Sequence, residues 1–323
     1  MSKIEEFRQI VEDQIQMLDG MKRPEGLYEP VRYVLSLGGK RLRPALCLTS
    51  AALFGDFSSA VIPAVGLEVF HNFTLLHDDI MDQSEVRRNQ PTVHKKWDNN
   101  TAILSGDAML IKAYELMTKS PVGVLPQVLE VFNKTAIEVC EGQQFDMDFE
   151  KTIDVTEDGY LDMIRLKTAV LIGGSMKIGG MLGGGSLRDC SLLYKFGQDI
   201  GMAFQLQDDW LDVYGDQESF GKRIGNDILT NKKTFLLITA LNRLEKESKK
   251  ELLDWIERKE YQAEDKITAV TSLFNEAGVS EIVRQKRDEY FFRAMENLEK
   301  INGKKEIKSE LQSFAHKLMA RAR

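Results

Sequence analysis

The sequence is poor in cysteine, and its few cysteines follow no functional spacing. Its 323 residues include Cys47, Cys140, Cys190 and four histidines. These residues form no CxxC pair and no set spaced like zinc ligands, so we expect neither a zinc site nor a disulfide framework. Thiols of this kind fit a reducing compartment.

Long hydrophobic runs are also missing. The most apolar stretch, residues 169–185, is interrupted by Lys177 and contains eight glycine or serine residues. It is therefore too short and too polar for a transmembrane helix. The first residues, MSKIEE, do not begin the apolar run of a signal peptide. We expect a soluble, cytoplasmic protein without stable membrane insertion.

Positive charge is in deficit. The chain has 43 basic and 50 acidic residues and a net charge of −7, which argues against a nucleic-acid partner. Any anionic ligand would need local basic residues or a metal to overcome that background. Hydrophobic residues make up 43% and charged residues 29%, which is typical of a globular protein.

No stretch shows the alternation of a strand, and helical periodicity dominates. Ile4, Phe7, Val11 and Ile15 begin an apolar stripe that ends near Asp19.

Because no linker divides the chain, we predict one all-α domain over residues 1–323, a bundle of ten or more helices. We expect an ordered loop at 215–233, and solvated helix faces in the charged stretches 242–265 and 284–310. Further helices are expected at residues 32–37, 44–54, 63–81, 101–117, 125–149, 159–182, 187–213, 235–247, 249–257, 264–277, 279–301 and 306–321.

Two DDxxD clusters interrupt apolar helices. Acids beside apolar surface are costly when uncompensated, so each cluster is either a solvated helix end or a metal site. The repetition favours the metal site. The first and last acids of each cluster share a helix face, and the middle acid lies about a hundred degrees aside. Oxygen ligands of this kind predict magnesium. The candidates are Asp78, Asp79, Asp82, Asp208, Asp209 and Asp212.

Basic residues flank both acid clusters. Arginine offers a planar fork for phosphate and lysine a compact charge, so these residues suggest two polyanions, one held through metal and one held directly. The alternative for each pair alone is surface charge. No P-loop, dinucleotide or nucleophile-elbow motif offers another phosphate or catalytic site. The residues are Lys40, Arg41 and Arg43, which follow two glycines, and Arg87, Arg88, Lys222, Lys232 and Lys233.

Six motifs follow one another along the chain. They are GGKRLRP at 38–44, HDDIMD at 77–82, RRNQPTVH at 87–94, KT at 167–168, FQLQDDWLD at 204–212 and GKRIGNDILTNKKT at 221–234. Together, at this spacing, they closely resemble the trans-isoprenyl diphosphate synthases of the polyprenyl synthetase family. The resemblance implies an isoprenoid synthase-like bundle around a central cavity, and a homodimer.

The resemblance also implies a head-to-tail prenyltransferase. It would condense isopentenyl diphosphate with dimethylallyl, geranyl or farnesyl diphosphate and release diphosphate. Three magnesium ions would be bound by Asp78, Asp82 and Asp208, with Asp79, Asp209 and Asp212 close by. The allylic diphosphate site would contain Arg87, Gln143, Asp146, Lys167, Thr168, Gln205, Lys222, Asp227 and Lys232. The isopentenyl diphosphate site would contain Gly38, Lys40, Arg43, His71 and Arg88.

The chain departs from the family pattern at two positions. Asn89 and Asn231 stand where the family usually has glycine. Asparagine tolerates left-handed backbone better than most residues, so we expect little loss.

Product length is expected to depend on the residues one turn before the first acid cluster. Phe73, five positions before Asp78, resembles the bulky residue of geranylgeranyl- and farnesyl-forming members, and Thr74 lies next to it. We expect a C20 product, with C15 as the next choice. The alternative is that Phe73 is ordinary core.

Three other functions are weighed against this one. A terpene cyclase shares the fold and the first acid motif, but it usually carries an Asn/Ser/Glu metal set at the second site and has no use for a second diphosphate pocket. A head-to-head condensing enzyme is similarly disfavoured. A non-catalytic regulatory subunit of a prenyl synthase typically loses acids from one motif, whereas this chain keeps all six.

Overall fold

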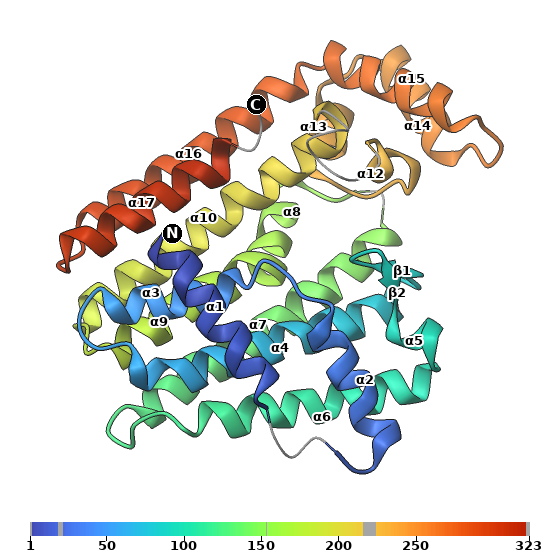
Figure 1. The fold of residues 1–323 in the computed structure, drawn as a ribbon. Coiled ribbons are helices and arrows are strands. Elements are labelled where there is room, and N and C mark those ends of the chain that lie inside the picture. The colour runs from blue at the N-terminus through green and yellow to red at the C-terminus, as the bar shows by residue number, and fades with distance from the viewer. Residues whose placement is uncertain (1, 19–21, 153, 216–223, 321–323) are drawn as a thin grey trace. The chain divides into compact units, whose positions relative to one another are not determined.

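The computed structural model describes residues 2–18, 22–152, 154–215 and 224–320, and these form two compact units (Figure 1). Each unit is described by itself, and the single-domain prediction stays a prediction. Unit 1 comprises Met1–Thr135, Ile172–Tyr194 and Lys300–Leu311, and unit 2 comprises Ala136–Leu171, Lys195–Glu299 and Gln312–Arg323.

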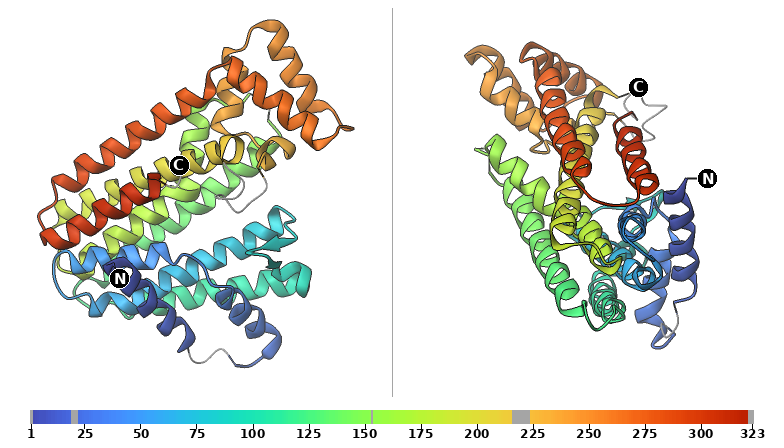
Figure 2. Two further views of the ribbon diagram at one scale, coloured as in Figure 1. Left: turned by 45° about the horizontal axis from the view of Figure 1, so that its top comes forward. Right: turned by 90° about the vertical axis from the view of Figure 1, so that its left-hand side faces the viewer.

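Unit 1 is organised around the apolar helix α4 (Val61–Met81). This helix packs along α6 (Asn99–Met117), beside which it lies in Figures 1 and 2, and it also contacts α1, α2 and α3. A two-residue antiparallel pair, β1 (Val86–Arg87) and β2 (Gln90–Pro91), follows α4. The other elements are α1 (Lys3–Gln16), α2 (Glu25–Ser36), α3 (Leu42–Ala52), η1 (Ser58–Ala60), α5 (Val93–Lys96), most of α9 (Val170–Leu182) and the first parts of α7 (Leu125–Glu150), α10 (Leu187–Tyr214) and α17 (Lys305–Ala320).

Unit 2 has its own core around α13 (Phe235–Arg243). Six consecutive side chains of α13, from Phe235 to Ala240, are buried, and the helix contacts α8, α14, α15 and α16. The other elements are α8 (Glu157–Ile164), the π-helical segment η2 (Arg165–Ala169), α12 (Asn226–Leu229), α14 (Lys246–Glu257), α15 (Ala263–Glu276), α16 (Val279–Glu299) and the remaining parts of α7, α10 and α17.

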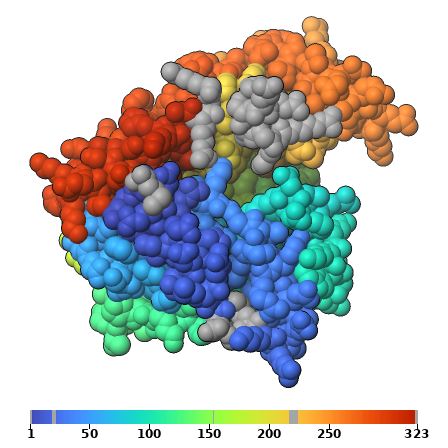
Figure 3. Space-filling view, viewed as in Figure 1, coloured from blue at the N-terminus to red at the C-terminus, as the bar shows by residue number. Residues whose placement is uncertain are grey.

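The first helix shows how the local sequence sets an element. The Ser2 hydroxyl accepts a hydrogen bond from the Glu5 amide, and the Glu5 carboxylate accepts one from the Ser2 amide, so a capping box begins α1. The predicted stripe from Ile4 to Ile15 is buried. The opposite face of α1 is at the surface, as Figure 3 shows in dark blue.

One described segment, Ser58–Met81, is long and apolar enough to cross a membrane by length and composition alone. Of its most apolar window, 67% is buried inside the structure. That burial, together with the contacts to α6, is typical of a core helix in a folded unit.

The all-α prediction is confirmed, and the strands β1 and β2 are the only ones in the described ranges. The predicted helices agree with the observed ones to within a few residues at most ends. The helix predicted at 159–182 is interrupted by the π-helical segment η2, and the short helix α5 was not predicted. Three further features differ. The second helix starts seven residues earlier, at Glu25, the expected loop 215–233 contains α12 in its described part, and the helix predicted at 235–247 ends at Arg243 before α14 begins. Residues 216–223 lie outside the described ranges.

Candidate active site

Both acid clusters lie at the C-terminal ends of long helices. Asp78 and Asp79 occupy the last turn of α4 and Asp82 is its C-cap, while Asp208, Asp209 and Asp212 occupy the last two turns of α10. The peptide dipoles of a helix give its C-terminal end a partial negative charge. The carboxylates therefore add to a potential that already attracts cations.

The middle acid of the first cluster is buried against an arginine. Asp79 is only 5% exposed, and Arg87 Nε donates to both of its oxygens at 2.8 and 2.9 Å. Arg87 Nη2 also donates to Asp78 Oδ2 at 3.2 Å. Burial raises the pKa of Asp79 to about 6 although Arg87 opposes the rise. Asp78 is half-buried and Asp82 exposed, so these two outer acids are the ones that a hydrated cation can reach.

The middle acid of the second cluster is also buried, against a tyrosine that the sequence did not single out. Asp209 is 2% exposed, and its Oδ2 accepts a hydrogen bond from the hydroxyl of the fully buried Tyr160 in α8. Gln205 Nε2 donates to Asp209 Oδ1 at 3.0 Å, and Thr168 donates to Gln205 at 3.3 Å. Burial raises the pKa of Asp209 to about 7. The structure thus links the predicted Thr168, Gln205 and Asp209 in one network of unit 2.

Asp212 holds the start of α12 by two hydrogen bonds. Its Oδ2 accepts from the Asp227 amide at 2.9 Å, and its carbonyl accepts from the Gly225 amide. The Asp227 carbonyl in turn accepts from the Lys232 amide at 2.9 Å. The last acid of the second cluster therefore fixes the backbone that carries the predicted Asp227 and Lys232.

The predicted Lys167 and Thr168 lie in the π-helical segment η2, a form that is rare in proteins and frequent at functional sites. Lys167 Nζ donates to Asp146 Oδ2 of α7 at 2.5 Å. A β-carbon at Gly142 would lie 2.3 Å from the Lys167 amide, so glycine is required for this approach of α7 to η2. Gln143 Nε2 is buried and has no hydrogen-bond partner among the described residues.

The two glycines that precede Lys40 have positive φ angles, which residues with a side chain rarely adopt. Gly38 has φ +73° and Gly39 has φ +141°. The Gly38 carbonyl accepts a hydrogen bond from Arg88 Nη1, and a β-carbon at Gly39 would lie 2.8 Å from Arg88 Nη2. The two glycines therefore let the Arg88 guanidinium lie directly against the backbone next to Lys40, which is exposed.

Arg43 and His71 meet within unit 1. Arg43 Nη1 lies 3.0 Å from His71 Nε2. Because a guanidinium only donates, Nε2 must be the unprotonated acceptor of a neutral imidazole. Burial and the charge of Arg43 lower the pKa of His71 well below its usual value, which agrees with a neutral imidazole. Burial also lowers the pKa of Arg43, to about 10.

Arg41 has a different role from its basic neighbours. It has left-handed backbone, with φ 43°, and its side chain is buried. Its Nε donates to Glu12 and its Nη1 to Glu68, both at 2.8 Å, and its Nη2 donates to the Leu35 carbonyl at 2.7 Å. Arg41 therefore joins α1, α2 and α4 and is not available to bind phosphate.

Phe73 lies in a row of rings along α4. Its ring centroid is 4.8 Å from that of His77 and 5.6 Å from that of Phe70. The His77 ring packs on Gly106 of α6, where a β-carbon would lie 2.2 Å from Nε2. Phe73 is 9% exposed, and Thr74 is the residue one turn before Asp78 on the same face.

The donors fit a hard divalent cation. The candidate ligands are carboxylates, and no group of three acid, histidine or cysteine side chains forms a metal cage within the described parts of the chain. Magnesium is usually bound by one or two carboxylates together with water and substrate phosphates, so a complete cage is not required. Lys222, also predicted for this site, lies outside the described residues.

Comparison with known proteins gives consistent matches. The sequence profile of the family described as polyprenyl synthetase matches residues 24–274. The geranylgeranyl diphosphate synthase of Methanosarcina mazei is 45% identical over 225 residues, 68% of this chain and 69% of that protein.

Solved structures agree over the full length. A crystal structure of a geranylgeranyl pyrophosphate synthase matches with a TM-score of 0.94 and 42% identity, covering 100% of both chains. The enzyme of the same name from Corynebacterium glutamicum, solved with isoprenyl diphosphate and magnesium, matches with a TM-score of 0.87 and 26% identity over 98% of this chain and 99% of that one. The chain therefore belongs to the polyprenyl synthetase family.

Proposed function

We propose that this chain is a head-to-tail trans-prenyltransferase that joins isopentenyl diphosphate to an allylic diphosphate and makes mainly a C20 product. The observation that carries the proposal is that all six acids of the two motifs are present in a member of this family. A terpene cyclase or a regulatory subunit would not need both sets.

Magnesium is the proposed cofactor, three ions in all, with Asp78, Asp82 and Asp208 as ligands. The magnesium and isoprenyl diphosphate in the C. glutamicum structure support this assignment. When bound, the metal supplies positive charge that stabilises the departing diphosphate. Asp79 would then orient the first acid cluster through its hydrogen bond from Arg87. Asp209 would orient the second cluster through its hydrogen bond from Tyr160.

Cationic side chains would bind the allylic diphosphate directly. Arg87 is held by Asp78 and Asp79, yet a guanidinium carries five N–H donors and can contact phosphate as well. Lys167 is held by Asp146. Loss of hydration lowers the pKa of Lys232, but Asp227, Asp209 and other carboxylates more than offset this, so the pKa is raised and the side chain stays charged. Preorganised charges of this kind favour the state in which negative charge grows on the leaving group.

Isopentenyl diphosphate would bind at Gly38, Lys40, Arg43, His71 and Arg88. The neutral His71 adds no charge but receives a hydrogen bond from Arg43, which fixes the direction of that guanidinium. The hydrogen bond between Arg88 and the Gly38 carbonyl fixes the second guanidinium in the same way.

The reaction needs no side-chain nucleophile. The allylic C–O bond breaks and its electron pair leaves with the diphosphate. The double bond of isopentenyl diphosphate then forms the new C–C bond, and a proton is lost, which we assign to the released diphosphate. Water must be excluded while the allylic cation exists. The apolar residues before both acid clusters suit that need.

An assay with primers of increasing length tests the proposal. Isopentenyl diphosphate would be supplied with dimethylallyl, geranyl or farnesyl diphosphate, with magnesium or with a chelator. We expect C20 from each primer and no product with the chelator. A cyclic hydrocarbon formed from a primer alone would indicate a cyclase. Inactivity with every primer, in a folded preparation with metal, would support a regulatory subunit.

Replacing Phe73 is expected to change the product. Phe73→Ala opens space one turn before the acids, so chains of C25 or longer should form at the expense of C20. The measurement is chromatography of the dephosphorylated alcohols.

The control for Phe73→Ala is Phe7→Ala, which removes a fully buried ring from α1. Both variants should lose about 3–5 kcal/mol of stability, but only Phe73→Ala should lengthen the product. If the product distribution stays the same in Phe73→Ala, the ring is ordinary core.

We also propose a homodimer in the cytoplasm, with α6 at the interface. Ile103, Leu104 and Ile111 on this helix are 45%, 59% and 69% exposed, an apolar strip that association would cover. Light scattering should give a dimer for the unmodified chain and a monomer for the Leu104→Asp/Ile111→Asp double variant. Val122→Asp, at an equally apolar but separate exposed position, should remain dimeric. A dimer that survives the double variant would place the interface elsewhere.

A further inference from the structure

A buried lysine lies in unit 2, outside the residues assigned above. Lys266 of α15 is 1% exposed. Its ammonium donates to Asn231 Oδ1 at 2.7 Å and lies 4.4 Å from the ring centroid of Tyr261. A buried ammonium is costly unless other groups compensate for its lost hydration. The position of this lysine therefore calls for an explanation.

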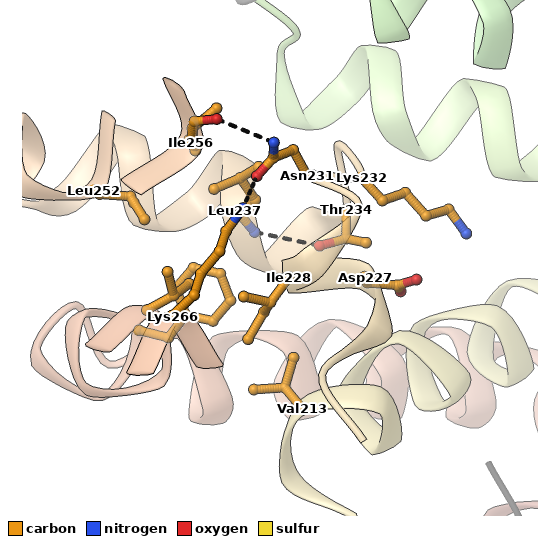
Figure 4. A pocket seen from close by; sticks show the side chains of 12 residues that line it. Val213, Asp227, Ile228, Asn231, Lys232, Thr234, Leu237, Leu252, Ile256 and Lys266 are labelled. Atoms are coloured by element: carbon orange, nitrogen blue, oxygen red, sulfur yellow. Dashed lines mark hydrogen bonds between the residues drawn. The ribbon is translucent and has the colours of Figure 1, made fainter. Parts of the chain in front are cut away.

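The partner of Lys266 is a residue with unusual backbone. Asn231 has φ 55°, in the left-handed region that side chains other than glycine rarely adopt. Its amide is held at both ends, because Nδ2 donates to the Ile256 carbonyl at the end of α14 at 3.1 Å while Oδ1 accepts from Lys266 (Figure 4). Two contacts from two different helices thus fix one side chain of the turn.

The next residue in the turn is Lys232. The Lys232 amide donates to the Asp227 carbonyl at 2.9 Å, and the Thr234 amide donates to the Lys232 carbonyl at 2.8 Å. Figure 4 shows the Lys232 side chain extending away from Lys266, on the side of Asp227. Because Lys232 directly follows Asn231 in the chain, a change in the backbone angle at Asn231 would change the direction of the Lys232 side chain.

We propose that Lys266 is a positioning residue: through Asn231 it holds the turn that presents Lys232 to the allylic diphosphate. The inference rests on the proposed function only in the identity of that ligand. Lys266 does not touch the diphosphate in this scheme. It supplies a hydrogen bond that keeps an asparagine in the left-handed region.

The surroundings of Lys266 make the proposal testable without destroying the fold. Lys266 lines a hollow of about 330 Å³, part of it open to solvent, together with apolar side chains that include Ile228, Leu252, Val270 and Phe274. A methionine has similar length and would fit among these side chains without a buried charge. Lys266→Met removes a buried charge, but it also leaves Asn231 Oδ1 without this donor, which costs some stability. Circular dichroism therefore has to show that Lys266→Met is folded before its binding is compared with that of the unmodified chain.

The first experiment measures binding of inorganic diphosphate in the presence of magnesium, by calorimetry, and the KM for geranyl diphosphate. Lys266→Met should weaken diphosphate binding about 10-fold and raise the KM for geranyl diphosphate by a similar factor. This is the order of one lost charge-assisted hydrogen bond. The KM for isopentenyl diphosphate should stay within about twofold, because unit 1 carries its proposed site. Lys266→Arg keeps a donor and should restore most of the binding. Lys259→Met, at an exposed position between α14 and α15, is the matched control and should bind as the unmodified chain does.

A second variant separates positioning from any other effect of the lysine. Glycine adopts left-handed backbone without strain, so Asn231→Gly should make Lys266 dispensable. In the presence of Asn231→Gly, the further change Lys266→Met should weaken diphosphate binding by less than about twofold. If Lys266→Met does not fold, Lys266→Gln replaces it, both alone and together with Asn231→Gly.

Two results would overturn the proposal. One is diphosphate binding that is unchanged in a folded Lys266→Met protein. The other is an equal loss of binding with and without Asn231→Gly. Both use diphosphate binding, so they do not depend on turnover. The variants could bind diphosphate as predicted while the unmodified protein forms no prenyl product. That result would contradict the proposed function and leave the positioning role of Lys266 intact.

Discussion

Replacing Asp208 with alanine is expected to lower kcat/KM by about 10³-fold, and Asp78→Ala should do the same. Each change removes an outer carboxylate at the C-terminal end of a long helix, where a cation would be attracted. Neither residue is in the fully buried core, so the fold should survive. The measurements are steady-state turnover with geranyl and isopentenyl diphosphates, and calorimetric binding of inorganic diphosphate at increasing magnesium.

The control for these variants is Asp154→Ala, an exposed acid between α7 and α8. It should retain activity, magnesium dependence and circular dichroism. Near-normal turnover of Asp78→Ala or Asp208→Ala with added magnesium would remove that residue from the proposed ligands. Equal inactivity of Asp154→Ala would point to a general effect of negative charge.

Replacing Arg41 with methionine should destabilise unit 1 by about 3–5 kcal/mol, because it leaves the buried carboxylate of Glu68 without its guanidinium. A loss of this size is a large part of the stability of an ordinary domain. Urea denaturation followed by circular dichroism measures it as a lower midpoint. Binding of inorganic diphosphate by protein that is still folded should change little, since Arg41 binds Glu12, Glu68 and the Leu35 carbonyl.

The double variant Arg41→Met/Glu68→Met provides the decisive comparison. It removes both buried charges and should recover much of the stability lost in Arg41→Met. Glu12 is 31% exposed and can be hydrated when its partner is gone. The matched control is Lys3→Met, which breaks an exposed pair with Glu6 on α1 and should cost less than about 1 kcal/mol. If Arg41→Met also costs less than this, the buried pair is not important for stability.

Several features of the candidate site could be predicted from neighbouring residues alone. The steps between apolar residues predicted most helices, since burial of one face imposes a period of about 3.6 residues. The same period places the outer acids of each cluster on one face and the middle acid aside. The structure agrees for the first cluster, in which Asp79 is the buried member, but in the second cluster the outer Asp212 is buried as well as Asp209. Asn89 and Asn231 adopt left-handed backbone, as their residue type allows.

Other features could not be predicted, because their partners are distant in the chain. Arg41 is 27 residues from Glu68, Lys266 is 35 from Asn231 and Tyr160 is 49 from Asp209. No spacing rule links such pairs. The charged stretch 284–310 was expected to be a solvated face, yet Arg287 in it is largely buried and donates to the buried Gln207 beside the second acid cluster.

The sequence by itself determined the all-α fold class, the family and the residue types of the candidate site. These follow from short-range patterns: helical period, motif order and the chemistry of carboxylates and guanidinium groups. Only the tertiary structure decided which basic residue is structural, which acids are buried and which distant side chain contacts Asn231. The reason is physical. Burial and hydrogen bonding depend on which helix faces meet, and that depends on the packing of whole helices rather than on neighbours in the chain.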